Sequence, residues 1–203
     1  MTPDQAQALF TRKDGSYLFA RWGRPIVPVV FGVDDATLSV FKGAIEAVAV
    51  LAGQEIAETD AELGANLMVF VFRDWAELPQ VPKLDQLIPD LGLLCDRLTG
   101  LDANQYRAFR FDDQGRIKAA FVFLRMGPAL ADLPAETLAL NEAVQVILLW
   151  GEAAFAGTSP LGQVGGAVVL RPEIADVIRA GYDKMMPAVA SDPSHAYRLA
   201  ARL

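Results

Sequence analysis

The feature that most constrains the fold is a short, almost wholly apolar run at residues 65–72. Such a run fits a β-strand that is buried on both faces. Before it, apolar residues recur at steps of three and four, which places them on one stripe of a helix of about five turns. Asp34 or Asp35 can cap this helix, and Gly53 can end it. The stripe consists of Leu38, Phe41, Ile45, Val48 and Ala52.

Two further strand-like runs, residues 106–111 and 117–124, flank a turn signal. Between them lies Asp112-Asp113-Gln114-Gly115, where the glycine can supply the positive φ that a hairpin turn requires. These aspartates could suggest calcium, but the ligand spacing of an EF-hand loop is absent and the hairpin explains them. Residues 18–31 are predicted to be extended, and their prolines favour an edge of the sheet.

The remaining segments complete an α+β pattern. We predict one or two short helices at residues 84–98, further helices at 134–150, 172–182 and 194–203, a glycine-rich loop at 158–166, and a loose arm or short helix at 1–16. The expected fold is a small mixed sheet packed against two long helices around one core. Residues 1–17 would form an N-terminal arm, and residues 18–203 a single domain.

Composition excludes several classes of protein. Apolar residues make up 53% and charged residues 21%, which supports a real core and argues against disorder. The net charge of −7 disfavours binding to nucleic acid or to anionic lipid. No apolar stretch is long enough to span a bilayer. Cys95, the one cysteine, cannot form an internal disulfide and is expected to be a small buried hydrophobe.

Several segments share a pattern with a known family. They are residues 21–27 (RWGRPIV), 66–72 (NLMVFVF), 140–145 (LNEAVQ), 171–176 (RPEIAD) and 182–184 (YDK). Over residues 18–200 the chain resembles a zincin-type metalloprotease domain in degenerate form, and in particular a bacterial family of uncharacterised, often exported zincin-like domains. The resemblance implies a zincin-like α+β fold, with the strand that begins at Asn66 beside the active cleft.

The chain departs from the family at the residues that carry the chemistry. A zincin uses H-E-x-x-H on a helix, where the two histidines bind zinc and the glutamate activates water. Here Glu142 keeps the general-base position, while Asn141 and Gln145 occupy the ligand positions, and neutral amides are poor zinc ligands. The only histidine is His195. The resemblance therefore implies the fold without a histidine-bound zinc site, and no metal or other cofactor is expected.

Each candidate residue also has a plain structural interpretation. Glu142 either points into a cleft shaped for a peptide-like ligand, or bonds a neighbouring strand or loop as part of a buried network with Asn141 and Gln145. His195 follows Ser191 and Asp192, but neighbouring residues at a helix start are explained more simply by capping than by a catalytic triad. The glycine-rich loop is a connection that could cover the cleft. The tryptophans are expected in the core.

We therefore predict a zincin-like domain without protease activity that binds a peptide or protein partner in a cleft between the strand 66–72 and the helix 136–150. Asn66, Asn141, Glu142 and Gln145 would line this cleft. Two alternatives stay open. One is a hydrolase that uses Glu142 with a second acid or an oxygen-ligated metal, and the other is a structural homo-oligomer. The lack of a leader favours the cytoplasm if the chain is complete, and a trimmed leader would favour the cell envelope or periplasm.

Overall fold

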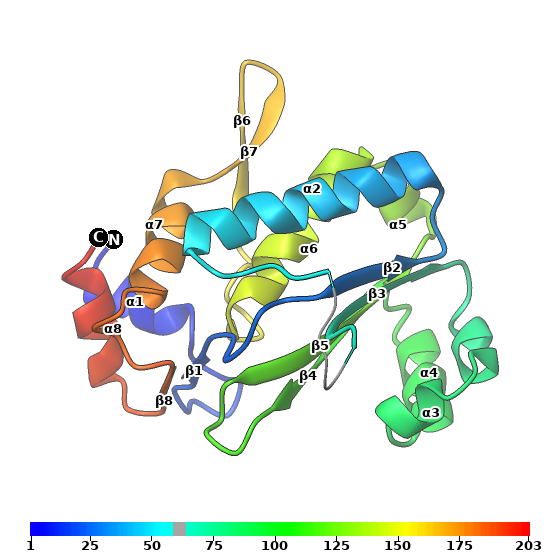
Figure 1. The fold of residues 1–203 in the computed structure, drawn as a ribbon, viewed down its shortest axis with the longest axis horizontal. Helices are drawn as coiled ribbons and strands as arrows, with labels where there is room; N and C mark the ends of the chain where they lie inside the picture. Colours follow the sequence, from blue (N-terminus) through cyan, green and yellow to red (C-terminus); the bar gives the residue numbers. More distant parts are fainter. Residues whose placement is uncertain (59–63) are drawn as a thin grey trace.

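A mixed four-stranded sheet organises the molecule (Figure 1). The structure, a computed structural model, describes residues 1–58 and 64–203. The strands lie in the order β2-β3-β5-β4, where β2, β3 and β5 are parallel and β4 is antiparallel to β5. Their bounds are β2 (Pro28–Phe31), β3 (Leu67–Phe72), β4 (Gln105–Phe111) and β5 (Ile117–Arg125). The predicted edge position of the proline-containing strand β2 and the predicted hairpin are both confirmed.

Helices cover both faces of this sheet. Leu67 and Val69 of β3 belong to the main core, while Phe70 and Phe72 belong to a second core that also contains Cys95. The main core lies under α2 (Asp35–Ala52) and α6 (Ala135–Ile147), and the second lies under η1 (Trp75–Gln80), α3 (Leu84–Leu87) and α4 (Leu91–Gly100). The apolar strand is thus buried on both faces, as predicted, and the fold is of the α+β class.

The two ends of the chain meet beside the sheet. In Figure 1 the termini lie close together, where the first helix packs against the last. The N-terminal segment, expected to be a loose arm or a short helix, contains the short helix α1 and contributes Ala6, Phe10 and Tyr17 to the main core. The other elements are α1 (Pro3–Ala8), β1 (Phe19–Ala20), α5 (Pro128–Ala131), β6 (Leu161–Val164), β7 (Ala167–Leu170), α7 (Pro172–Gly181), β8 (Val189–Ala190) and α8 (Ser194–Ala200). Among the described residues, no helix is both long and apolar enough to cross a membrane.

Helix α2 begins and ends where the sequence predicts. The Asp34 carboxylate accepts from the backbone N–H of Thr37 at 2.8 Å, which satisfies one of the free donors of the first turn. Gly53 follows the helix with a φ of +68°, a conformation that glycine adopts without steric cost.

Helix α6 ends three residues earlier than predicted, at Ile147 instead of residue 150. Leu148 is extended and forms an antiparallel bridge with Arg21. The apolar pattern continues past the end of the helix because the residues after it are buried as well. Hydrophobicity alone therefore could not mark the end of the helix.

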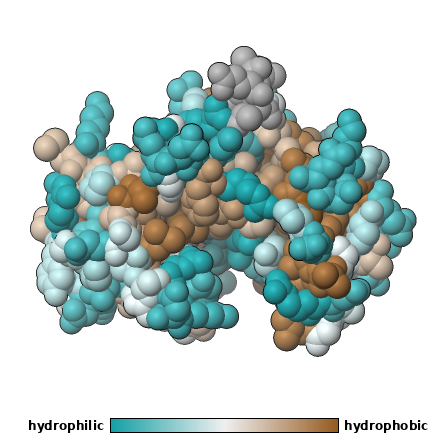
Figure 2. Space-filling model, turned by 90° about the horizontal axis from the view of Figure 1, so that it is seen from below, coloured by the Kyte–Doolittle hydropathy of each residue, from teal (hydrophilic) through white to brown (hydrophobic). Residues whose placement is uncertain are grey.

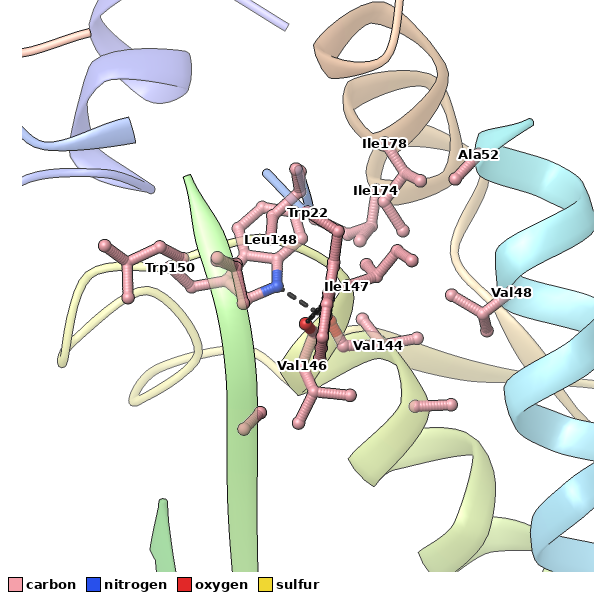
Figure 3. Packing of buried hydrophobic residues seen from close by; sticks show 14 of the residues in the cluster. Trp22, Val48, Ala52, Val144, Val146, Ile147, Leu148, Trp150, Ile174 and Ile178 are labelled. Carbon is pink, nitrogen blue, oxygen red and sulfur yellow. Dashed lines mark hydrogen bonds between the residues drawn. The ribbon is translucent and has the colours of Figure 1, made fainter. Parts of the chain in front are cut away.

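Aromatic donors satisfy the last carbonyls of α6, which have no partner within the helix. Figure 3 shows the indole nitrogen of Trp22 pointing at the end of this helix. The bonds run from Trp22 Nε1 to Val146 O at 2.8 Å, from Trp150 Nε1 to Val144 O at 2.7 Å, and from the Tyr182 hydroxyl to Ile147 O at 2.9 Å. Segments far apart in the sequence thus close one helix end, and all three tryptophans are buried as predicted.

The glycine-rich segment 158–166 was predicted to be a loop, and most of it is strand and turn. Strands β6 and β7 form a hairpin whose two-residue turn consists of Gly165 and Gly166, with φ of +58° and +86°. Two consecutive positive φ angles are the mark of a type I′ turn, which matches the twist of the flanking strands. Figure 1 shows this hairpin projecting from the body of the molecule.

Candidate functional site

The carboxylate of Glu142 is the most deeply buried acidic group in the candidate site. Its residue is only 2% exposed on α6, and a buried charge requires a partner to offset its desolvation. Arg107 supplies that partner from strand β4. Its guanidinium donates from Nε to Oε2 at 2.9 Å and from Nη2 to Oε1 at 2.7 Å, which is a bidentate, charge-assisted contact.

Strand β4 positions Arg107 by its register. Arg107 lies opposite Val122 of β5, whose side chain belongs to the main core, so the arginine faces the same side of the sheet. Gln105, two residues earlier on that face, accepts from Arg107 Nη2 at 2.8 Å. On the helix, Asn141 donates to Glu142 Oε1 at 2.9 Å. We call these four residues the Arg107 cluster: Gln105, Arg107, Asn141 and Glu142.

In the Arg107 cluster, the carboxylate oxygens that a catalytic glutamate would need free are already hydrogen-bonded. Both oxygens of Glu142 accept hydrogen bonds from a cation or an amide. A general base must instead reach the proton that it abstracts. Within residues 1–58 and 64–203, no group of three or more His, Cys, Asp or Glu side chains is arranged to hold a metal ion. The contacts of Glu142 therefore favour neither hydrolysis nor metal binding.

Asn66 and Gln145 lie elsewhere relative to this cluster. Asn66 is buried at the start of β3, where its Oδ1 accepts from Val27 N at 2.8 Å and its Nδ2 donates to Pro25 O at 2.8 Å. Its side chain thus ties the segment before β2 to the central strand. Gln145 is half-buried on α6, one turn after Asn141. The structure brings Asn141 and Glu142 together and gives Asn66 a separate, architectural set of bonds.

A pocket of 340 Å³ opens at the carboxyl ends of β2 and β3, between the starts of α2 and α6. From α6 it receives Ala135 and Leu138, which precede the Arg107 cluster on the helix. Its lining is mostly apolar, with Asp34 and Arg73 at its polar side. The four residues predicted to line a cleft do not line this pocket. They are Asn66, Asn141, Glu142 and Gln145.

No family model, curated protein or solved structure matches the chain. The functional interpretation therefore rests on the contacts of the Arg107 cluster and on its place at the edge of the sheet. Arg107 and Gln105 are the two members that were not predicted from the sequence. A buried carboxylate on an apolar helix requires a cation, and only one of Arg107 and Arg110 can face the helix because strand side chains alternate. That pairing was the available signal.

His195 forms a separate buried polar contact near the chain ends. It is 3% exposed, and its Nδ1 lies 2.7 Å from the hydroxyl of Tyr17. Its Nε2 is buried without a hydrogen-bond partner in the described part of the chain. Asp192 precedes the N-cap residue Pro193 and accepts from the backbone N–H of Ser194 at the start of α8, and so does not orient the imidazole. This arrangement supports the capping interpretation of the segment and not the catalytic triad.

Acid is expected to destabilise the protein through His195. Burial, followed by the positive charges of Arg198 and Arg21, lowers the pKa of His195 from 6.5 to about 4. The unfolded chain therefore binds this proton first, so the contribution to stability is full above pH 6.5 and is lost as the pH falls toward 4. The loss reaches at most about 3 kcal/mol. Urea unfolding of the wild type and of His195→Gln across this range measures it. Equal pH slopes for the two proteins would contradict the assignment.

Proposed function

We propose that this chain is a non-catalytic, zincin-like binding domain that holds an extended segment of a partner polypeptide along the free edge of β4. The observation that carries the proposal is the position of β4. It is the last strand in the sheet order, and Arg107 anchors it to α6 through the bidentate contact with Glu142. A firmly held edge strand with no strand neighbour among the described elements is a template for strand addition.

The backbone of β4 offers alternate residues to such a partner. Arg125 N donates to Asn104 O, which makes residues 104 and 125 a hydrogen-bonded pair of the antiparallel ladder. Because these pairs alternate along the ladder, Gln105, Arg107 and Phe109 direct their backbone groups away from β5. An added strand would bond these groups, and hydrogen bonds of this kind supply affinity without demanding a particular sequence.

Side chains on both sides of β4 would supply selectivity. Toward α6, the half-buried Asn141 and Gln145 provide amides. On the other side, a groove of 430 Å³ lies between α4 and β4, with Leu93, Arg97 and Tyr106 among its lining residues. Figure 2 shows hydrophobic side chains exposed on the side of the molecule that carries α3 and α4, and Leu93 is 72% exposed. A partner with alternating polar and apolar side chains would contact the amides of α6 on one side and the groove between α4 and β4 on the other.

The zincin resemblance supports this proposal in one respect. Helix α6, which carries the segment that resembles the zincin motif, contacts the edge strand β4 through Glu142. A zincin-like domain that had lost its zinc ligands would thus keep this glutamate as the ion-pair partner of Arg107. No contact among the residues that the structure describes favours the hydrolase alternative. The proposed activity is recognition of an extended peptide, without cleavage of it.

Proline at position 109 is the direct test. Phe109→Pro removes one outward N–H of β4 and leaves the bonds of residues 106, 108 and 110 to β5 intact. We expect peptides enriched from a displayed random-peptide library on the wild-type protein to bind this variant at least about tenfold more weakly by calorimetry.

The matched control is Phe109→Ala, which removes the same ring but keeps the N–H. It should bind the enriched peptides within about threefold of the wild type. Equal losses in both variants would show that the side chain, and not the strand edge, makes the contact. A library that yields no binding peptide would also count against the proposal.

A further inference from the structure

The hairpin arm, residues 161–170, is unlike the rest of this acidic chain. No charged residue occurs between Glu152 and Arg171, although the protein carries a net charge of −7. The arm projects from the body of the molecule (Figure 1), and Val164 near its tip is 68% exposed. Its base is anchored, because Leu161 is buried and Leu170 packs against the main core. An apolar, uncharged arm is thus held out into solvent.

Such an arm lacks the usual protection of exposed strands. A two-stranded hairpin is only marginally stable in water on its own. Among the described strands, β6 and β7 pair only with each other, so each has one edge without a strand partner, although β7 also contacts α6. Exposed strand edges are normally protected against further pairing by a charged residue, often lysine, or by proline. Strands β6 and β7 contain neither a charged residue nor a proline. The arm therefore has the properties of a surface that is covered in solution.

We propose that a second copy of this chain covers the arm, by antiparallel pairing of the β7 strands of two arms into one continuous sheet. The register permits this. Arg171 N donates to Pro160 O at 2.9 Å, so residues 160 and 171 form a hydrogen-bonded pair. By alternation, Val168 and Leu170 turn their backbone groups to the outer edge of β7. A two-fold axis between the two β7 strands then gives these backbone groups the same hydrogen bonds in both copies.

The absence of charge on the arm permits this occupant. Two bodies of charge −7 repel each other, but projecting arms can meet while the bodies stay apart, and the arms bring no charge to the contact. A lipid surface fits less well. The nearest cation, Arg171, donates to Ser159 O at 2.9 Å and to Leu161 O at 3.2 Å, and an anionic headgroup layer repels an acidic protein. The arm contains no part of β4, so pairing of two arms is independent of peptide binding at β4.

A charge introduced at the tip tests the proposal. By size-exclusion chromatography with light scattering, the wild-type chain is expected to have about twice the monomer mass of 21.9 kDa, and Ala167→Lys about that mass itself. Ala167 is exposed at the start of β7, so lysine is tolerated in the monomer but unfavourable in the pairing of two β7 strands. The matched control is Val50→Lys, an exposed position on α2, which should remain dimeric.

A second variant addresses the backbone. Val168→Pro removes an outward N–H of β7 while the bonds between β6 and β7 at residues 162 and 164 remain. It should weaken self-association by about tenfold or more in sedimentation equilibrium. A wild-type chain that stays monomeric into the millimolar range would overturn the proposal. So would a dimer that Ala167→Lys leaves intact, or a monomer that co-sediments with phosphatidylcholine and phosphatidylglycerol vesicles through the arm.

Discussion

Arg107→Met is expected to lower the free energy of unfolding by about 3 kcal/mol, because it leaves the Glu142 carboxylate buried without a cation. Methionine keeps much of the aliphatic stem of arginine, so the lost term is mainly the ion pair. Asn141 still donates to Glu142 and offsets part of the loss. Chemical denaturation of the two proteins under the same conditions measures the difference.

The double variant Arg107→Met, Glu142→Leu separates the ion pair from simple packing. Replacing both partners of a buried pair by apolar residues is often nearly neutral, so most of the lost stability should return. Glu142→Leu alone should destabilise less than Arg107→Met, because the Arg107 side chain is 19% exposed and can reach water. Strictly additive effects of the two single changes would show that the residues do not interact.

Gly32→Ala is expected to lower the free energy of unfolding by more than about 3 kcal/mol, or to prevent folding altogether. Gly32 follows β2 with a φ of +82°, and a Cβ atom there would lie 1.9 Å from the carbonyl oxygen of Val71. The substitution therefore combines an unfavourable backbone conformation with a clash against backbone that cannot move without disturbing β3. Thermal unfolding or the yield of soluble protein reports the effect.

Gly53→Ala provides the control for this change. Gly53 also has a positive φ, +68°, but a Cβ atom added there would meet nothing within 4 Å among the described residues. Only the conformational cost applies there, so we expect a loss of about 1 kcal/mol. Similar losses at the two positions would mean that the approach of the chain after β2 to β3 is looser than the contact with Val71 indicates.

Much of the fold could be predicted because local signals agreed with one another. The capped stripe of α2, the doubly buried strand β3 and the turn between β4 and β5 each combine a periodicity with a matching end signal. The errors arose where one signal was used alone. The run at the end of α6 stays apolar after the helix has ended, and two adjacent glycines were treated as flexibility although they fit a tight hairpin turn.

The candidate site was predicted only in part, for a different reason. Glu142 and Asn141 stand out because they are polar residues on an apolar helix. Their partner Arg107 is thirty-five positions earlier than Glu142, on a strand whose register with β5 had to be known before its direction could be assigned. Asn66 was a candidate because the resemblance places its strand beside the cleft, yet its bonds serve the backbone of residues 25 and 27. Sequence patterns identify buried polar residues more readily than the partners that they bind.

The packing of α1 against α8 constrains the order in which the protein can fold as it is synthesised. Helix α1 has as its neighbour α8, which is synthesised much later, and β1 likewise pairs with β8. Tyr17, which precedes β1, reaches His195 only when α8 has emerged from the ribosome. The sheet and α2 can assemble on the nascent chain, but α1 and β1 find their partners only after α8 has emerged, so residues 1–20 must avoid aggregation until then.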